Sequence, residues 1–132
     1  MSQVHARFRI FVVDDEIIIA STLAIILQRS GFDAVFFTDP LEALQAARLN
    51  APILLITDVV MPGISGIDLA IALKEEVPDC KILLFSGQAA TANMLQAAQA
   101  KGHDFELLAK PIHPADLLKK IKTVTEESEA VL

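Results

Sequence analysis

Apolar runs and amphipathic segments alternate five times along this chain. The apolar runs predict strands over residues 8–13, 33–37, 53–57, 81–85 and 105–109, and the segments that follow them predict helices over 16–30, 39–48, 65–76, 89–100 and 114–126. Runs that are apolar throughout and bounded by polar residues are typical of strands buried on both faces. Because the connections are short, the pattern predicts βα units with right-handed crossovers, and therefore an α/β fold with a parallel sheet.

Residues with specific backbone preferences mark the ends of several predicted helices. Gly31 follows the first helix, where a left-handed terminating residue is favoured. Asp39 precedes Pro40 and offers a capping carboxylate to the second helix, while Ser65 offers a capping hydroxyl to the third. The acidic end of the chain, residues 125–132, is expected to fray.

Length and composition limit the kind of protein. A chain of 132 residues that is 53% hydrophobic fits a single domain over 1–132 with one core. The net charge of −6 and the pI near 4.9 argue against nucleic-acid binding, which favours a basic face. No apolar stretch reaches the ~18–20 residues of a membrane span, and residues 1–7 are too short and polar for a secretory signal. We expect a cytoplasmic protein without a membrane or direct nucleic-acid partner, which its single cysteine also fits.

Side chains that can do chemistry lie where four of the predicted strands end. Asp14 and Asp15 follow the first strand, Asp58 the third, Ser86 the fourth and Lys110 the fifth. The carboxyl ends of parallel strands share one edge of the sheet, and ligands bind outside that edge. The sequence therefore predicts that an acid cluster, a hydroxyl and an ammonium meet there, a set that suits a divalent cation and a phosphoryl group.

The adjacent acids Asp14 and Asp15 allow two interpretations. One carboxylate at a strand end is an ordinary cap for the following helix, but two of them, with Glu16 beside them, exceed what a cap requires. Clustered carboxylates repel each other unless a cation neutralises them. With Asp58 at a neighbouring strand end, a metal site becomes the favoured interpretation, and a few hard oxygen ligands suit Mg²⁺.

Asp58 has no helix to cap, because the next predicted helix begins only near Ser65. It is either a loop carboxylate that faces water or a nucleophile that attacks phosphorus and forms an aspartyl phosphate. Ser86 and Lys110 are weak signals singly, since Ser-Gly turns and solvated lysines are common. At matching strand ends, and together with the acids, they favour phosphoryl transfer.

These motifs together resemble the receiver domain of two-component response regulators, in the CheY-like superfamily. Over roughly residues 8–124 the chain carries Val-Val-Asp-Asp-Glu, Asp-Val-Val-Met-Pro-Gly-Ile-Ser-Gly, Phe-Ser-Gly and Ala-Lys-Pro-Ile. The resemblance implies a three-layer, flavodoxin-like (βα)5 sandwich whose parallel five-stranded sheet has the order 2-1-3-4-5. It also implies a phospho-acceptor that takes a phosphoryl group from a sensor histidine kinase or phosphotransfer protein and signals through a phosphorylation-dependent contact with an unidentified output protein.

The resemblance assigns the acids to phosphorylation and to Mg²⁺. Asp58 would be the phospho-acceptor and also a metal ligand. Asp15 would bind Mg²⁺ directly, Asp14 directly or through water, and Val60 through its backbone carbonyl.

The resemblance assigns the remaining positions to the phosphate, with one departure. Ser86 would be the switch hydroxyl, and Lys110 would contact the phosphate and form a cis bond to Pro111. Receivers usually carry a tyrosine or phenylalanine three residues before this lysine, where the present chain has Leu107. Strand alternation would put Phe105 on the same face, so Phe105 could take over if the strand were regular.

Two other functions stay open at this point. One is a phosphatase-type hydrolase with an aspartyl-phosphate intermediate, and the other is a docking module that is never phosphorylated. Hydrolases of the haloacid-dehalogenase type want a second acid two residues after the nucleophile, where this chain has Val60, which cannot act as an acid or base. The complete acid, hydroxyl and lysine set argues against docking alone. A receiver would catalyse only its own phosphoryl transfer and dephosphorylation, and the chain would be a stand-alone receiver or part of a longer regulator.

Overall fold

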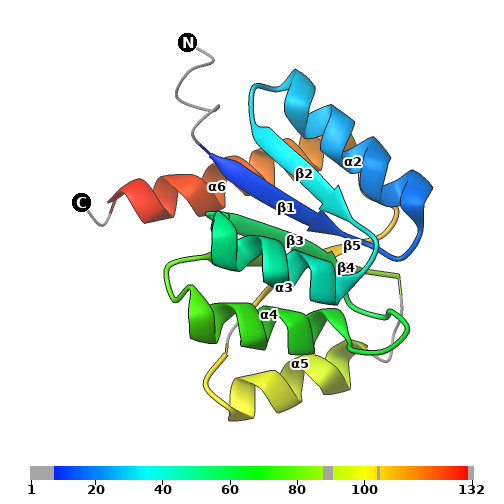
Figure 1. Ribbon diagram of the computed structural model, residues 1–132, viewed down its shortest axis with the longest axis vertical. Helices are drawn as coiled ribbons and strands as arrows, with labels where there is room; N and C mark the ends of the chain where they lie inside the picture. The colour runs from blue at the N-terminus through cyan, green and yellow to red at the C-terminus, as the bar shows by residue number, and fades with distance from the viewer. Residues whose placement is uncertain (1–7, 88–90, 104, 131–132) are drawn as a thin grey trace.

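The computed structural model describes residues 8–87, 91–103 and 105–130, in which strands and helices alternate (Figure 1). The strands are β1 (Arg9–Val13), β2 (Asp33–Phe37), β3 (Leu54–Asp58), β4 (Lys81–Ser86) and β5 (Glu106–Ala109). The helices are α2 (Ile17–Arg29), α3 (Pro40–Leu49), α4 (Gly66–Glu76), α5 (Thr91–Ala100) and α6 (Pro114–Ala130). The predicted βα alternation is confirmed.

The strands form one parallel sheet in the order β2-β1-β3-β4-β5, as predicted. β1 and β3 are neighbours near the middle of the sheet, although β2 and two helices separate them in the chain. Their register pairs Val13 with Thr57. The next residues, Asp14 and Asp58, therefore leave the sheet at the same level.

Helices cover both faces of the sheet and give the molecule three layers (Figure 1). Helices α2 and α6 bury one face, and α3, α4 and α5 bury the other. Side chains alternate across a strand, so Ile10 and Val12 of β1 pack under the first layer while Phe11 and Val13 pack under the second. The central strands need apolar residues throughout because neither face meets water.

The helix boundaries follow the predicted capping residues. Gly31 has φ of 94°, a left-handed conformation that glycine adopts without steric cost, and its N–H donates to the carbonyl of Gln28 after α2. Asp39 Oδ1 accepts the N–H of Leu41 at 2.9 Å. Ser65 Oγ accepts the N–H at the third position of α4 at 3.1 Å. These bonds satisfy backbone donors that a helix leaves unpaired at its start.

Most predicted boundaries hold within one residue, but the end of the last helix and the start of the fifth strand carry consequences. Helix α6 continues to Ala130, so the expected fraying is wrong up to that residue, where the glutamates and the alanine of the segment favour helix. Strand β5 begins at Glu106, which leaves Phe105 outside the strand. The predicted start of the fourth helix, residues 89 and 90, lies outside the described residues.

Cys80 is the single cysteine of the chain. Cys80 is 1% exposed, and desolvation raises the pKa of its thiol to about 12. The thiol therefore stays protonated at neutral pH, which suits a packing role rather than a reactive one.

Within the part of the chain that the structure describes, no helix combines the length and apolar character needed to cross a membrane.

The packing predicts opposite consequences for two helical leucines. Leu27 of α2 is completely buried, whereas Leu49 at the end of α3 is 91% exposed. Leu27→Ala is expected to lower the free energy of unfolding by about 2–5 kcal/mol, because it removes buried methyl groups and leaves a cavity. The matched control Leu49→Ala should stay within about 0.5 kcal/mol of the parent. Urea denaturation of both variants measures the difference, and equal effects would contradict this description of the core.

Candidate functional site

The structure brings the predicted site residues to the carboxyl edge of the sheet. Asp14 and Asp15 directly follow β1, and Asp58 is the last residue of β3. Ser86 is the last residue of β4, and Lys110 directly follows β5. The strand order places β1, β3, β4 and β5 next to one another, so residues spread over almost a hundred positions meet at one edge.

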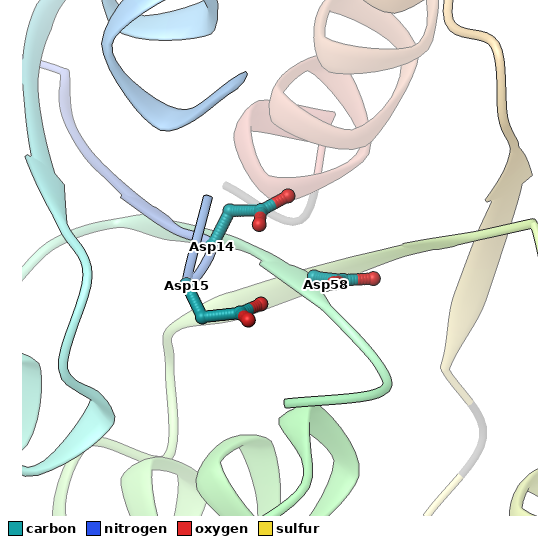
Figure 2. A group of neighbouring side chains, drawn as sticks. All are labelled: Asp14, Asp15 and Asp58. Carbon is teal, nitrogen blue, oxygen red and sulfur yellow. The ribbon is translucent and has the colours of Figure 1, made fainter. Parts of the chain in front are cut away.

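The three aspartates form a compact acid cluster. One carboxylate oxygen from each of Asp14, Asp15 and Asp58 lies within 4.8 Å of the others. Figure 2 shows Asp14 and Asp15 at the end of one segment with Asp58 beside them on another, their carboxylates close together. Asp14 is fully buried and Asp58 is 7% exposed, whereas Asp15 is exposed. The cluster is therefore open to solvent at Asp15 and buried at Asp14 and Asp58.

Asp14 also satisfies part of the capping interpretation. Its Oδ1 atom accepts the backbone N–H of Glu16 at 2.9 Å, just before α2 begins at Ile17. The other oxygen, Oδ2, faces the ammonium of Lys110 at 3.5 Å. A single carboxylate thus fixes the turn into α2 and contributes charge to the site, so the two interpretations of this residue are compatible.

Lys110 is the positive charge of the site. Its Nζ atom lies 3.3 Å from Asp58 Oδ1 and 3.5 Å from Asp14 Oδ2, and 4.9 Å from the centre of the Phe85 ring. Its backbone N–H donates to the carbonyl of Ser86 at 3.0 Å, which ties the ends of β4 and β5 together. The Lys110–Pro111 peptide bond is cis, as the resemblance implies.

The carboxylates are hard to ionise together. Burial raises the pKa of Asp14, and the neighbouring charges of Asp58 and Asp15 raise it further, while the bond from Glu16 and the charge of Lys110 oppose the shift. Burial likewise raises the pKa of Asp58, with Lys110 opposing it. One ammonium does not offset the desolvation and mutual repulsion of the acids, so the site favours a further positive charge.

The donor set fits a metal ion. Three carboxylate oxygens near one another supply hard, anionic ligands, and the exposed side of the cluster leaves room for water or ligand oxygens. The raised pKa values of Asp14 and Asp58 identify the cluster as a place where a cation would relieve an unfavourable charge arrangement. Asp14, Asp15 and Asp58 can therefore hold a metal ion together.

Two predicted contributors lie at the site without a directly observed role. Val60 belongs to the loop between β3 and α4 and is 47% exposed, next to the fully buried Val59. Ser86 is 6% exposed at the end of β4, whose register pairs Phe85 with Asp58. The assignment of the Val60 carbonyl to a metal and of the Ser86 hydroxyl to a phosphate remains a prediction.

The sequence interpretation missed two residues that shape the site. The Phe85 ring lies under the Lys110 ammonium, a contact that pairs residues from adjacent strands and has no local sequence signal. Thr57 is completely buried, and its hydroxyl donates to the backbone carbonyl of Asp58 at 3.0 Å. The one available signal was a polar residue inside the otherwise apolar run of β3.

The structure argues against Phe105 as a replacement for the missing switch aromatic. Leu107 is 39% exposed and pairs in register with Leu84, while Ala109 pairs with Ser86. Phe105 precedes the strand and its ring stacks on His103 at a centroid distance of 5.5 Å. At about 3.3 Å per residue, Phe105 lies roughly 13 Å along the chain from the level of Ser86, twice as far as Leu107. Phe105 is thus anchored at the opposite end of β5.

Fold and site together define a doubly wound α/β protein with an acid cluster and a lysine at the carboxyl edge of its sheet. Residues 10–122 match the family model of the response regulator receiver domain, and the chain belongs to this family. Its members are signalling modules of two-component systems that act as phospho-acceptors.

Curated relatives include transcriptional regulators of about twice the length. The DNA-binding response regulator MtrA of Mycobacterium tuberculosis (strain ATCC 25618 / H37Rv) is 31% identical over 118 residues, which cover 88% of this chain and 50% of MtrA. The alkaline phosphatase synthesis transcriptional regulatory protein PhoP of Bacillus subtilis is 29% identical over 121 residues, which cover 92% of this chain and 50% of PhoP. The chain thus spans about half the length of these relatives.

Solved structures of receivers superpose over nearly the whole chain. A CheY-like response regulator receiver domain protein from Methanospirillum hungatei JF-1 matches with a TM-score of 0.85 and 26% identity, covering 95% of this chain and 98% of that one. The response regulator TrrA from Thermotoga maritima, solved in complex with Mg(2+)-BeF, matches with a TM-score of 0.77 and 31% identity, covering 89% and 98%. The predicted CheY-like fold is confirmed.

The raised pKa of Asp58 predicts a pH-dependent effect of Asp58→Asn in the absence of metal. The folded protein holds the Asp58 proton more tightly than the unfolded chain, so the parent loses stability as pH rises from the unfolded pKa of about 3.9 through the folded pKa. Asn has no proton to lose. The variant should therefore be more stable than the parent at pH 7, and the difference should shrink towards pH 4.

Urea denaturation in EDTA at pH 7, 5.5 and 4 measures this difference, with exposed Asp79→Asn as the control. The control is expected to show no comparable pH-dependent gain. An Asp58→Asn variant that is less stable than the parent at pH 7 would mean that Lys110 more than offsets the burial of Asp58.

Proposed function

We propose that this chain is the phospho-accepting receiver of a two-component system and that Asp58 is the residue that takes the phosphoryl group. The observation that supports this most directly is the position of Asp58, which lies in the acid cluster and 3.3 Å from the Lys110 ammonium. Asp58 thus combines a nucleophilic oxygen with neighbours that can screen the negative charge of an incoming phosphate.

The proposed step is a displacement at phosphorus. A carboxylate oxygen of Asp58 forms a bond to phosphorus while the bond to the leaving group breaks, that is, the P–N bond of a phosphohistidine or the P–O bond of acetyl phosphate. Lys110, which now lies between Asp58 and Asp14, pairs with a phosphoryl oxygen as the Asp58 carboxylate becomes an acyl phosphate. The Ser86 hydroxyl donates to another phosphoryl oxygen.

The cation that fits this role is Mg²⁺, held by Asp14, Asp15, Asp58 and the backbone carbonyl of Val60. When bound, it supplies charge neutralisation between the acid cluster and the phosphate oxygens. Asp15 lies on the exposed side of the cluster, which solvent can reach. Asp14 is held in place because its Oδ1 atom accepts the N–H of Glu16. Of the two adjacent acids, Asp14 is thus fixed in position and Asp15 is accessible.

The surface beside the site suits a protein phosphodonor such as a sensor histidine kinase or a phosphotransfer protein. Helix α2 exposes Ile17 and Ile18, which are 60% and 77% exposed. Ile18 also lines an apolar groove of about 660 Å³ that α2 and the segment after β5 form together with Phe85 and Lys110. A donor that presents its phosphohistidine to Asp58 would bury this groove.

The hydrolase alternative finds no support in the described residues around Asp58. The side chain two positions further on is Val60, which has no group for proton transfer. We therefore assign no catalytic activity beyond the chain's own phosphorylation and dephosphorylation. The chain as a whole, 1–132, is proposed to act as one receiver domain in the cytoplasm, with its output through a further protein contact and without direct nucleic-acid contact.

Phosphorylation by acetyl phosphate with Mg²⁺ tests the assignment of Asp58. Intact mass is expected to report one added phosphoryl group on the parent and none on Asp58→Asn, because the amide is not a nucleophile. Asp79→Asn is the control and should be labelled like the parent, and EDTA should suppress labelling. Labelling of Asp58→Asn at the parental rate would refute the assignment.

Replacing a ligand should affect metal binding more than replacing the lysine. Asp15→Asn removes an anionic ligand and should weaken Mg²⁺ binding at least as much as loss of an outer-shell partner, which costs about 10–100-fold. Lys110→Ala removes a competing positive charge and should leave the affinity equal or higher.

Mg²⁺-dependent stabilisation in urea measures these affinities, since binding contributes about 2.7 kcal/mol at 100 times Kd. Unfolding curves of the parent that do not change with millimolar Mg²⁺ would contradict the metal site. So would a larger loss in Lys110→Ala than in Asp15→Asn.

A further inference from the structure

The first residue of α4 packs directly on the backbone of the proposed phospho-acceptor. A Cβ atom on Gly66 would overlap the carbonyl oxygen of Asp58, and it would lie 2.8 Å from the carbonyl carbon of Asp58 and 3.1 Å from Thr57 Oγ1. Gly66 is buried. Any larger residue at this position would have to displace either the start of α4 or the end of β3.

Space, rather than backbone conformation, is what requires glycine here. Gly63 and Gly102 have φ values of 84° and 90°, in the left-handed region, and an added Cβ would meet nothing within 4 Å at either. Gly66 lies at a helix start without a left-handed φ, where other residues fit the backbone equally well. The close approach to Asp58 is therefore the feature that excludes a side chain.

Thr57 contacts the same carbonyl group beside Gly66. Its hydroxyl is completely buried in β3 and donates to the carbonyl oxygen of Asp58 at 3.0 Å. A buried hydroxyl needs a partner, and this bond supplies it. The Asp58 carbonyl is thus fixed by a hydrogen bond from Thr57 and by contact with Gly66.

Gly66 also contacts the loop between β3 and α4, which carries Val60. The N–H of Gly66 donates to the carbonyl of Val59 at 2.8 Å, and the N–H of Val59 donates to the carbonyl of Phe85 on β4 at 3.2 Å. Both peptide groups of Val59 are therefore held, one by the sheet and one by α4. The second of these peptide groups leads directly into Val60.

We propose that Gly66 and Thr57 are positioning residues for the acid cluster: together they set where the Asp58 carboxylate and the Val60 carbonyl lie relative to Asp14 and Asp15. The inference rests on the proposed function, because it assumes that Asp58 accepts the phosphoryl group. Neither residue touches the reacting atoms. Both act on the Asp58 backbone, and a displacement of about 1 Å at a reacting group can slow a reaction up to about 10²-fold.

Four variants test the proposal. Gly66→Ala introduces the overlapping Cβ, Thr57→Val removes the hydroxyl with little change of shape, and Thr57→Ser keeps the hydroxyl. Leu73→Ala is the control for lost stability, because Leu73 is a core residue of the same helix, 2% exposed and about two turns beyond Gly66. The acetyl phosphate labelling rate at saturating Mg²⁺ and the Mg²⁺ affinity are measured at a temperature where urea curves confirm that each variant is folded.

We expect labelling to slow at least about tenfold in Gly66→Ala and severalfold in Thr57→Val, with weaker Mg²⁺ binding in both. Thr57→Ser should return to within about twofold of the parent, and Leu73→Ala should keep the parental rate despite lower stability. If Gly66→Ala does not fold, the Thr57→Val and Thr57→Ser pair carries the test on its own.

The outcomes separate the two proposals. Parental rates and affinities in Gly66→Ala and Thr57→Val would overturn the positioning role while leaving the assignment of Asp58 intact, and so would equal slowing in Leu73→Ala. If the parent itself is not labelled on Asp58, the proposed function fails, and Mg²⁺ affinity alone decides the inference. Weakened affinity in Gly66→Ala then supports the positioning role for the metal site, and unchanged affinity overturns it.

Discussion

The parallel pairing of β1 with β3 is the constraint on which the site depends. The register sets Val13 opposite Thr57, so Asp14 and Asp58 come off adjacent strands at one level. A slip by one residue would turn every side chain of β1 to the opposite face and move the acids out of alignment. The slip is opposed by apolar packing, because Ile10, Phe11, Val12 and Val13 are all buried against helices on both faces. The core therefore fixes the geometry of a polar site that it does not itself contain.

The apolar packing holds the carboxylates of Asp14 and Asp58 close together although they repel each other when ionised. Asp14 and Asp58 are buried next to each other, and burial is the main reason that their pKa values are raised. The energy that keeps them together comes from the apolar layers, while Lys110 offsets only part of the repulsion. A site of this kind responds to added positive charge and to altered charge on Asp58, which is the electrostatic requirement of a switch. Under the proposed function, the same burial that destabilises the acids would make the cluster sensitive to phosphorylation of Asp58.

The sequence was enough to predict the fold and which polar residues come together at the carboxyl edge of the sheet, since both depend on strong local patterns. Strands that are apolar throughout indicate a parallel sheet. The polar residues that follow such strands then lie together at the carboxyl edge of that sheet. Contacts between distant segments left no such pattern. The closeness of Gly66 to Asp58 depends on how α4 turns back over β3, and the glycine alone does not reveal it. The ring of Phe85 beneath Lys110 likewise requires the β4–β5 register.

The length of α6 and the extent of β5 were harder to predict for another reason. Helix α6 continues to Ala130 through a polar stretch whose hydrophobic periodicity has ended, so only residue propensity favours the helix there. At β5, four residues form the strand and Phe105 falls just before it, although the apolar pattern includes Phe105. Edge strands pair on one side only, which leaves their ends less strongly determined by sequence than those of central strands.

Leu107 stands where receivers usually carry an aromatic, and Phe105 lies before β5, away from the level of Ser86. A phosphate on Asp58 can shift a conformational equilibrium only through contacts that differ between the two states. Besides its pairing with Phe85 in the sheet, the Asp58 backbone is contacted by the Thr57 hydroxyl and by Gly66, and Gly66 leads directly into α4. A second connection runs from Lys110 to the end of β4 through the bond to the Ser86 carbonyl. Under the proposed function, a change on Asp58 would therefore reach α4 through the peptide groups packed against Gly66, and the end of β4 through the side chain and backbone of Lys110, without the rotation of an aromatic ring.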